Sequence, residues 1–255
     1  VQLGQPDQLV VTENSSFHQD VSCFGGSDGE VQLSASGGTP NFSYSIDNVS
    51  YQTSPNFTNL SASNSWFYVK DNNNCQASII LNILQPQQAL ILHEILPSHQ
   101  NVACSAFSDG QLEIVSSGGV SPYSYVLNQD TVSIGLFDSL TAGLYQLTAI
   151  DANNCIVDTS IQITEPTPLS LSYTFTQPSC YAVNDGALVT QISGGTPNYF
   201  TTWEGNYSDT LQNISAENYQ FIVVGDNNCT DQWLANLSQP TCVIFREVMS
   251  RQEDI

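Results

Sequence analysis

The sequence predicts an all-β protein made of small antiparallel β-sandwiches in tandem, and three observations support this. Apolar and polar residues alternate with a period of two, as in strands with one buried face. Clusters of Gly, Pro, Asn and Ser interrupt the apolar segments, and the same series of motifs occurs three times. Units of about 75 to 80 residues with short strands are typical of immunoglobulin-like sandwiches.

Each unit contains the same motifs in the same order. A Cys is followed by Asp-Gly, Ser-Gly-Gly, alternating aromatic residues, an Asn-rich turn that ends in a second Cys, and a Pro. The first unit has Cys23, Asp28-Gly29, Ser36-Gly37-Gly38, Asp71 to Cys75 and Gln85-Pro86; the second has Cys104, Asp109-Gly110, Ser117-Gly118-Gly119, Asp151 to Cys155 and Glu165-Pro166; the third has Cys180, Asp185-Gly186, Ser193-Gly194-Gly195, Asp226 to Cys229 and Gln239-Pro240.

The closing prolines predict the domain boundaries. Repeats 1, 2 and 3 are expected at residues 7–86, 87–166 and 167–240, with residues 1–6 as the end of a preceding repeat and residues 241–255 as an off-pattern tail. Because Gln5-Pro6 matches a closing motif, we expect the chain to begin inside a longer array. The links between repeats are short, which favours a semi-rigid string of domains.

Two strands in each unit have especially clear inner faces. One follows the Asp-Gly turn and the other precedes the Asn-rich turn. The predicted inward residues are Val31/Leu33/Ala35 and Ser65/Phe67/Val69 in repeat 1, Leu112/Ile114 and Tyr145/Leu147/Ala149 in repeat 2, and Leu188/Ile192 and Tyr219/Phe221/Val223 in repeat 3.

Six of the seven cysteines occur two per unit, at separations of 52, 51 and 49 residues. This regularity predicts one disulfide within each repeat and an oxidising compartment. Metal ligation is the alternative, but there is no CxxC motif and the histidines do not recur with the cysteines. The predicted pairs are Cys23–Cys75, Cys104–Cys155 and Cys180–Cys229, with Cys242 free or paired with an absent partner.

The charge excludes several functions. With 3 Lys+Arg against 24 Asp+Glu, the net charge is −21, which argues against recognition of nucleic acid or anionic membranes. No apolar segment is long enough to span a bilayer, so we expect no direct membrane insertion.

The sequence contains no convincing catalytic group, and we predict that the protein is not an enzyme. Gly25 to Gly29 matches Gly-x-Ser-x-Gly, but the equivalent turns of the other repeats do not preserve it and no helix follows. His93-Glu94 with His99 has the wrong spacing for a metalloprotease helix. No cofactor is predicted, apart from a possible calcium ion.

The acidic turns are the calcium candidates, because carboxylate oxygens suit Ca²⁺ and an intra-repeat disulfide would bring two of these turns together. The alternative is that Asp-Gly and Asn-rich segments are simply favoured turn chemistry, and Gly225 replaces one aspartate. Trp66, Trp203 and Trp233 are candidates for sugar stacking, with core packing as the alternative. The calcium candidates are Asp28 with Asp71, Asp109 with Asp151, and Asp185 with Asp226.

These motifs together resemble the SprB repeat, over about 235 of the 255 residues. Ala142-Gly143-Leu144-Tyr145 adds to the resemblance, whereas Ser65 stands where tyrosine is usual. The resemblance implies a very large cell-surface adhesin of gliding Bacteroidota, exported by the type IX secretion system. It also implies O-glycosylation at Asp-Ser/Thr motifs, with Thr131, Ser139 and Thr210 as candidate sites.

The predicted function is a non-enzymatic, extracellular adhesin segment that forms a stalk or contributes multivalent adhesion. Gliding is the best-known role that the resemblance implies. The expected partners of the segment are surface polysaccharides or other cell-surface proteins, together with neighbouring repeats of the same chain. The alternative is a segment of an extracellular filament or matrix, in which exposed sheet edges pair between chains. A glycan-binding module of a secreted hydrolase is a third possibility.

Overall fold

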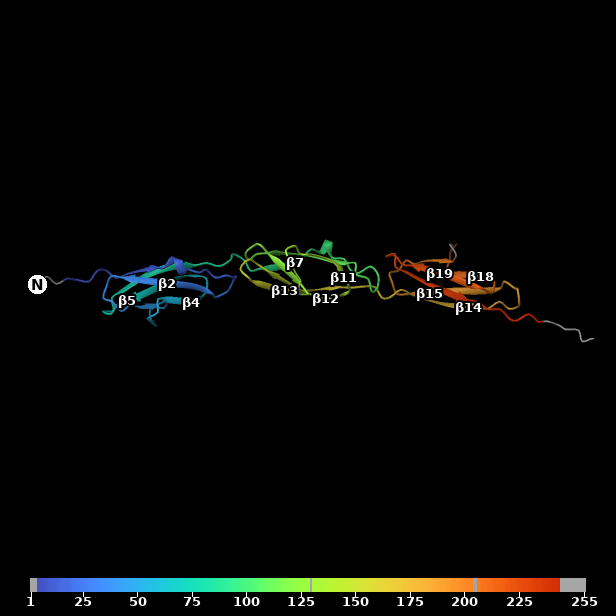
Figure 1. Cartoon of the computed structure of the whole chain (residues 1–255), viewed down its shortest axis with the longest axis horizontal. Helices are drawn as coiled ribbons and strands as arrows, with labels where there is room; N and C mark the ends of the chain where they lie inside the picture. Colours follow the sequence, from blue (N-terminus) through green and yellow to red (C-terminus); the bar gives the residue numbers. More distant parts are fainter. Residues whose placement is uncertain (1–3, 129, 204–205, 244–255) are drawn as a thin grey trace, which may run out of the picture. The chain divides into compact units, whose positions relative to one another are not determined.

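The computed structural model describes residues 4–128, 130–203 and 206–243, and these residues are almost entirely β-strands and turns. Within these ranges, the helical segments are two 3-10 turns, η1 (Ser15–Phe17) and η2 (Leu96–Ser98). The strands form sandwiches of two sheets each (Figure 1). The prediction of an all-β chain of tandem antiparallel sandwiches is therefore confirmed.

Two three-stranded sheets form the first sandwich. The first, second and fourth strands share one sheet, in the order β1-β2-β4, and the other sheet has the order β3-β5-β6. This is the immunoglobulin-like arrangement, in which strands A, B and E face strands C, F and G. The strands are β1 (Val10–Glu13), β2 (Gly29–Ser36), β3 (Ser43–Ser45), β4 (Asn56–Leu60), β5 (Ser63–Lys70) and β6 (Gln76–Ile83).

The second and third sandwiches repeat this topology and add one short strand at the edge of the second sheet. Their sheets have the orders β11-β8-β7 with β10-β9-β12-β13, and β14-β15-β18 with β17-β16-β19-β20. The strands of the second are β7 (Ile91–Glu94), β8 (Gly110–Ser117), β9 (Ser124–Leu127), β10 (Asp130–Val132), β11 (Leu136–Leu140), β12 (Gly143–Ile150) and β13 (Ile156–Ile163). Those of the third are β14 (Ser170–Thr176), β15 (Gly186–Ser193), β16 (Phe200–Trp203), β17 (Asn206–Tyr207), β18 (Thr210–Ile214), β19 (Asn218–Val224) and β20 (Thr230–Asn236).

The cores form where alternating side chains of the two sheets meet, as the period of two predicts. Phe67 and Val69 of β5 are fully buried, and so are Phe221 and Val223 of β19. In the first sandwich Phe57 packs edge-on against Phe67, with ring centroids 5.2 Å apart. The strands that follow the Asp-Gly turns also have the predicted buried face. Its side chains include Val31, Leu33, Leu112, Ile114 and Leu188, which are all buried.

Trp203 belongs to the core of the third sandwich. It is only 2% exposed, its ring centroid lies 4.3 Å from that of Phe221, and its Nε1–H donates to the carbonyl oxygen of Ser208. Core packing therefore accounts for Trp203, which is too buried to stack on a sugar. Trp66 and Trp233 stay at the surface.

A tyrosine ties the start of β19 to the preceding loop. The Tyr219 hydroxyl donates to the Ser215 carbonyl oxygen at 3.1 Å and contacts Glu217 Oε1 at 2.9 Å. This matches the tyrosine corner of immunoglobulin-like domains, in which a tyrosine near the start of strand F bonds to the backbone a few residues upstream. The first repeat has Ser65 in the corresponding strand and lacks this contact.

The chain divides into two compact units, and the division passes through the second repeat. Leu112–Leu136 and Leu144–Ile161 belong with the first repeat, whereas His99–Gln111 and Phe137–Gly143 belong with the third. The disulfides described below each lie within one of these units. Of the predicted tail, residues 241–255, the structure describes 241–243, and the rest lies outside the described residues.

Candidate functional site: the junction disulfides

The disulfides join neighbouring repeats. Cys23 of repeat 1 bonds to Cys155 of repeat 2, and Cys104 of repeat 2 bonds to Cys229 of repeat 3. Their Cα atoms are 5.7 and 5.6 Å apart, within the usual range for a disulfide. The predicted pairs Cys23–Cys75, Cys104–Cys155 and Cys180–Cys229 are therefore wrong. Cys75, Cys180 and Cys242 are free and exposed.

The length of one strand explains why the cysteines of one repeat do not pair. Cys75 directly precedes β6, whereas the loop that holds Cys23 contacts Gln85, just beyond the other end of β6. A strand of eight residues is about 26 Å long, whereas the Cα atoms of a disulfide are at most ~7 Å apart. The two cysteines of a repeat thus lie at opposite ends of the sandwich, where each can meet only a neighbouring repeat.

The first cysteine of each repeat sits in a loop held by two side chains. Asp28 accepts the Ser22 N–H through Oδ1 at 3.0 Å and the Ser22 hydroxyl through Oδ2, and these two donors hold the pKa of Asp28 below its usual range. Gln85 of the closing Gln-Pro motif accepts the Gly25 N–H at 2.7 Å. The equivalent contacts are Ala103 N–H to Asp109 (3.0 Å) and Ala106 N–H to Glu165 (2.6 Å), then Ser179 N–H to Asp185 (2.8 Å) and Ala182 N–H to Gln239 (3.0 Å).

The second cysteine ends a turn organised around a buried aspartate. Asp151 Oδ1 accepts the N–H groups of Asn153 and Cys155, and its Oδ2 accepts the N–H of Val120, at 2.8 to 2.9 Å. Asp71 makes the same three contacts in repeat 1, and donation by the Thr39 N–H is the main reason that its pKa is lowered. In repeat 3 Gly225 takes this position without a carboxylate; its N–H donates to the Cys229 carbonyl oxygen at 2.8 Å, and its own carbonyl oxygen accepts the Asn228 N–H at 2.9 Å.

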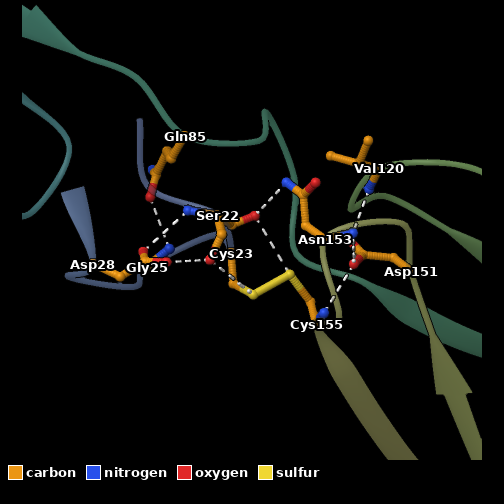
Figure 2. The surroundings of a disulfide bond; sticks show 9 residues. All are labelled: Ser22, Cys23, Gly25, Asp28, Gln85, Val120, Asp151, Asn153 and Cys155. Atoms are coloured by element: carbon orange, nitrogen blue, oxygen red, sulfur yellow. Dashed lines mark hydrogen bonds between the residues drawn. A yellow bond between two sulfur atoms is a disulfide. The ribbon is translucent and has the colours of Figure 1, made fainter. Parts of the chain in front are cut away.

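Polar contacts accompany the first junction disulfide (Figure 2). Asn153 Nδ2 donates to the Ser22 carbonyl oxygen at 2.8 Å, and Cys155 Sγ lies 3.4 Å from the same oxygen. The Asn-rich turn of one repeat therefore faces the carbonyl that precedes the first cysteine of the repeat before it.

The second junction has the same geometry. Asn227 Nδ2 donates to the Ala103 carbonyl oxygen at 3.1 Å, and Cys229 Sγ lies 3.3 Å from that oxygen. Cys104 and Cys229 are 7% and 8% exposed, whereas the unbonded Cys75 and Cys180 are exposed. Both cysteines of the second junction are thus buried, and in the first junction Cys155 is buried and Cys23 is half-buried.

The Gly-Gly motif packs against the peptide that links two repeats. Gly118 has a φ of +70°, and a Cβ at this position would lie 1.9 Å from the Ala89 carbonyl oxygen. The N–H of Gly119 donates to the Gln88 carbonyl oxygen at 2.9 Å. The linker is thereby held beside the turn that carries Cys155, so two covalent connections run side by side at the junction.

The calcium candidates divide between the two kinds of loop. Asp28, Asp109 and Asp185 hold the loops of the first cysteines, Asp71 and Asp151 hold the turns of the second, and Asp226 is exposed. The disulfides bring Asp28 toward the turn of Asp151, in the next repeat, and not toward Asp71. Over the described ranges, no group of three or more His, Cys, Asp and Glu side chains is placed to hold a metal ion. Calcium binding stays a prediction.

The glycosylation candidates lie away from the junction contacts. Thr131 and Ser139 are exposed, and Thr210 is half-buried. Ser139 donates to Asp138 Oδ1 at 3.1 Å, and Thr210 donates to Asp209 Oδ1 at 3.2 Å. No helix among the described residues is long and apolar enough to cross a membrane.

Sequence reasoning missed the junction side chains. The sequence motifs include Asn153 and Asn227 only as members of Asn-rich turns, and Gln85 and Glu165 only as members of the closing motif. The available signal was the Asn that stands two residues before the second cysteine of every repeat, because a turn alone needs no particular side chain at that position. The repeated series of motifs thus encodes the joints between sandwiches as well as the sandwiches.

The fold and the cross-links define a tandem array of immunoglobulin-like sandwiches, a class that is typically non-catalytic. Within it, two segments of the chain, residues 15–50 and 98–132, match the family model for the SprB repeat. Both segments include a first cysteine and its Asp-Gly turn. The two SprB matches and the fold support an extracellular, adhesin-type repeat segment.

Solved structures with similar folds have low sequence identity. The three-domain ectodomain of mouse nectin-like molecule 4 is 7% identical, with 80% of this chain and 84% of that chain covered and a TM-score of 0.36. The Dpr2 Ig1-Ig2 complex with DIP-Theta is 9% identical, with 89% and 99% covered and a TM-score of 0.32. Fibronectin(III)-like modules of Clostridium thermocellum CbhA are 12% identical, with 61% and 94% covered and a TM-score of 0.30. No curated protein matches the chain.

Proposed function

We propose that this chain is a non-enzymatic segment of a secreted cell-surface adhesin, in which the repeats form a stalk that displays adhesive surfaces or adds weak adhesion of its own. The observation that carries this proposal is the pair of disulfides between repeats. Each junction has two covalent connections, the linker and the disulfide, which limit rotation more than one short linker does. A stalk requires such restricted joints.

Multivalency is the proposed mechanism of adhesion. Many weak contacts on one covalent chain raise the effective concentration of each remaining contact, so the chain holds a surface while single contacts exchange. Surface polysaccharides and other cell-surface proteins are the proposed partners. The charge of −21 favours neutral or cationic surfaces over nucleic acids and anionic lipids.

Export by the type IX secretion system and O-glycosylation belong to the same proposal. Thr131, Ser139 and Thr210 are the proposed acceptors, and Thr131 and Ser139 are accessible. The intact mass of protein from its source cells is expected to exceed the mass of the polypeptide by whole hexose units. A mass equal to that of the unmodified polypeptide would remove glycosylation from the proposal.

The deciding experiment is fluorescence imaging of live source cells with an antibody against these repeats. Label on the cell surface is expected, and label that travels along the cell body would assign the adhesin to gliding. Static label along thin appendages, or label mainly in the medium, would instead favour a filament or matrix component.

A further inference from the structure

The outer face of one sheet in the first repeat differs from the same face in the other two repeats. On β5 the side chains of Trp66, Tyr68 and Lys70 alternate with the buried Phe67 and Val69, so these three lie in a row on the surface of the sheet β3-β5-β6. We propose that this row, which we name the β5 strip, binds a neutral, extended polysaccharide such as a cellulose-type glucan or a glucomannan. The proposal rests on the adhesin function proposed above and adds a site and a ligand class to it.

The fold of a repeat does not require an aromatic strip at this face. Counted back from the turn that carries the second cysteine, the corresponding residues are Gln146, Thr148 and Ile150 in repeat 2 and Gln220, Ile222 and Val224 in repeat 3. In repeat 2 Thr148 donates to Asp158 Oδ1 at 2.6 Å. In repeat 3 Gln220 Nε2 donates to Gln232 Oε1 at 3.4 Å. The other two repeats therefore fill this face with side chains that bond to each other.

The polar atoms of the β5 strip are open to a ligand. Trp66 is 51% exposed, and the indole N–H groups of Trp203 and Trp233 each donate to an oxygen of the third sandwich. Within the part of the chain that the structure describes, neither the indole N–H of Trp66 nor the hydroxyl of Tyr68 has such a partner. Each ring of the strip thus presents an apolar face and a free donor, which together suit a sugar that exposes C–H groups beside hydroxyls.

Charge favours a neutral ligand at this face. Strands β3, β5 and β6 contain no Asp or Glu, and Lys70 is the only Lys or Arg among the described residues. Its Nζ lies 4.1 Å from the centroid of the Tyr51 ring, and over the same residues it forms no ion pair. The ammonium group opposes a cationic ligand, whereas the net charge of −21 on the chain opposes an anionic one.

A network of neutral polar groups borders the strip beside Lys70. Gln76 of β6 is the cross-strand partner of Lys70, and its Nε2 donates to the Tyr51 hydroxyl at 3.1 Å. The Tyr51 hydroxyl and Gln76 Nε2 donate to Asn48 Oδ1, at 2.6 and 3.2 Å. These bonds hold the Tyr51 ring under the ammonium group, and Asn48 and Gln76 are exposed. Amides and hydroxyls both donate and accept hydrogen bonds, as sugar hydroxyls do.

The shape of the β5 strip suits an extended chain. Successive outward residues of a strand are about 7 Å apart, so the strip runs ~14 Å along β5. Ile80, the cross-strand partner of Trp66, is 51% exposed and widens the apolar surface. A pyranose ring with equatorial hydroxyls presents C–H groups on its faces, and these are attracted to the negative face of an aromatic ring. Trp66 and Tyr68 can thus stack on rings of one polysaccharide chain.

Affinity gel electrophoresis of the full chain tests the proposal. At a charge of −21 the folded chain migrates readily in a native gel, and a polysaccharide cast into the gel slows a chain that binds it. Hydroxyethylcellulose and glucomannan are the neutral probes, and alginate is the anionic probe. Retardation by at least one neutral probe is expected, and none by alginate. No retardation by either neutral probe, or retardation by alginate alone, would overturn the proposal.

Trp66→Gln is the deciding variant, because glutamine stands at this position in repeats 2 and 3 and the fold accepts it there. Its affinity for the retarding polysaccharide should fall about tenfold, which corresponds to ~1.4 kcal/mol. Trp233→Gln is the control at the other exposed tryptophan and should keep the full affinity, and thermal unfolding of both variants confirms that they are folded.

A purely structural Trp66 would give a different result. As a cross-strand pair, Trp66 and Ile80 contribute to the stability of the sheet. If Trp66→Gln lowers the melting temperature but is retarded as strongly as the unsubstituted chain, Trp66 serves only this pair and the proposal is wrong.

The binding experiment and the imaging of live cells fail independently. A chain that labels the cell surface but binds neither neutral probe would overturn the site and leave the adhesin function in place. A chain that binds a neutral probe through Trp66 but does not label the cell surface would overturn the adhesin function and leave the site in place.

Discussion

The side-chain amide of Asn153 donates a 2.8 Å hydrogen bond to the carbonyl oxygen of Ser22, which lies in the preceding repeat. Each residue is a near neighbour of a bonded cysteine: Asn153 is two residues before Cys155, and Ser22 is one residue before Cys23. Asn227 and Ala103 reproduce this relationship at 3.1 Å. The covalent and polar contacts of a junction therefore join the same two loops, and the same pairing occurs at both junctions.

Disulfide mapping of the non-reduced protein should give Cys23–Cys155 and Cys104–Cys229 peptides and three reactive thiols per denatured chain, because Cys75, Cys180 and Cys242 are free. Cys155→Ser should raise the number of thiols to four, since it releases Cys23. A peptide that joins Cys23 to Cys75 would contradict the junction connectivity.

Asp151→Asn should lower the free energy of unfolding by about 1 to 3 kcal/mol, the cost of leaving a buried hydrogen-bonding group without its partner. The amide keeps one acceptor oxygen, but its NH₂ group cannot accept the N–H of Val120, which Asp151 Oδ2 accepts at 2.9 Å. Urea unfolding measures the change.

Gly225→Asp is the matched substitution in repeat 3, where the carboxylate is absent. It should stabilise the chain by about 0.4 to 1 kcal/mol through the smaller conformational freedom of the unfolded chain, provided that Thr196, whose carbonyl oxygen would lie 3.0 Å from the new Cβ, shifts slightly. A loss of stability would show that the third turn does not accept the carboxylate.

Tyr219→Phe should destabilise the third sandwich by ~1 kcal/mol, because it removes the hydroxyl that bonds to Ser215 and Glu217 and leaves the ring in place. Thermal unfolding measures the loss. Tyr199→Phe is the control at another hydroxyl that donates to a backbone carbonyl, that of Gly194 at 2.6 Å. If Tyr219→Phe leaves the stability unchanged, the hydroxyl does not fix the loop before β19.

Stability should fall as the pH rises above about 6.5, because hydrogen bonding to Glu13, and then to Asp20, raises the pKa of His18 above 6.5. The contribution of protonated His18 is complete below pH 6.5 and is lost as the pH passes through the raised pKa. The Leu84 N–H lowers the pKa of Asp20, so that its contribution is lost only in acid, below pH 3.8. The imidazole is partly exposed, so the effect should stay below ~1 kcal/mol. His18→Gln should abolish this part of the pH dependence of the melting temperature.

Metal removal should leave the melting temperature unchanged. The oxygens of Asp151 accept three backbone N–H groups and those of Asp28 accept two donors from Ser22, so hydrogen bonds within the protein hold both carboxylates in place without a cation. Melting curves with EDTA and with added Ca²⁺ test this. A lower midpoint in EDTA that Ca²⁺ restores would instead support the predicted calcium sites.

The sandwich was predictable because burial on one face of a strand imposes a period of two. Phe67, Val69, Leu147 and Phe221 all point inward, as their alternation indicates. The recurrence of the motifs likewise predicted that each repeat would have the same loops. Local pattern and burial are properties of a single repeat, so one sequence contains enough information to assign them.

The cysteine partners were not predictable in the same way. Separations of about 50 residues within each repeat are just as regular as separations of 132 and 125 residues between repeats. Deciding between them requires knowledge of which end of the sandwich each loop occupies, and that depends on the full course of strands such as β6. The side chain of Gln85, which contacts the Cys23 loop, marks that end only once the fold is known.

The connectivity of the disulfides changes how the chain bears tension. From Cys23 to Cys229 the backbone has 206 peptide steps, but the shortest covalent route passes through both disulfides and only the 51 steps between Cys104 and Cys155. At about 3.4 Å per residue, complete unfolding lets Cys23 and Cys229 move ~170 Å apart in the oxidised chain and ~700 Å apart in the reduced chain. Single-molecule pulling with and without reductant would measure this difference. The junctions thus act as length limiters, and a load that unfolds the sandwiches is still borne by a short covalent route.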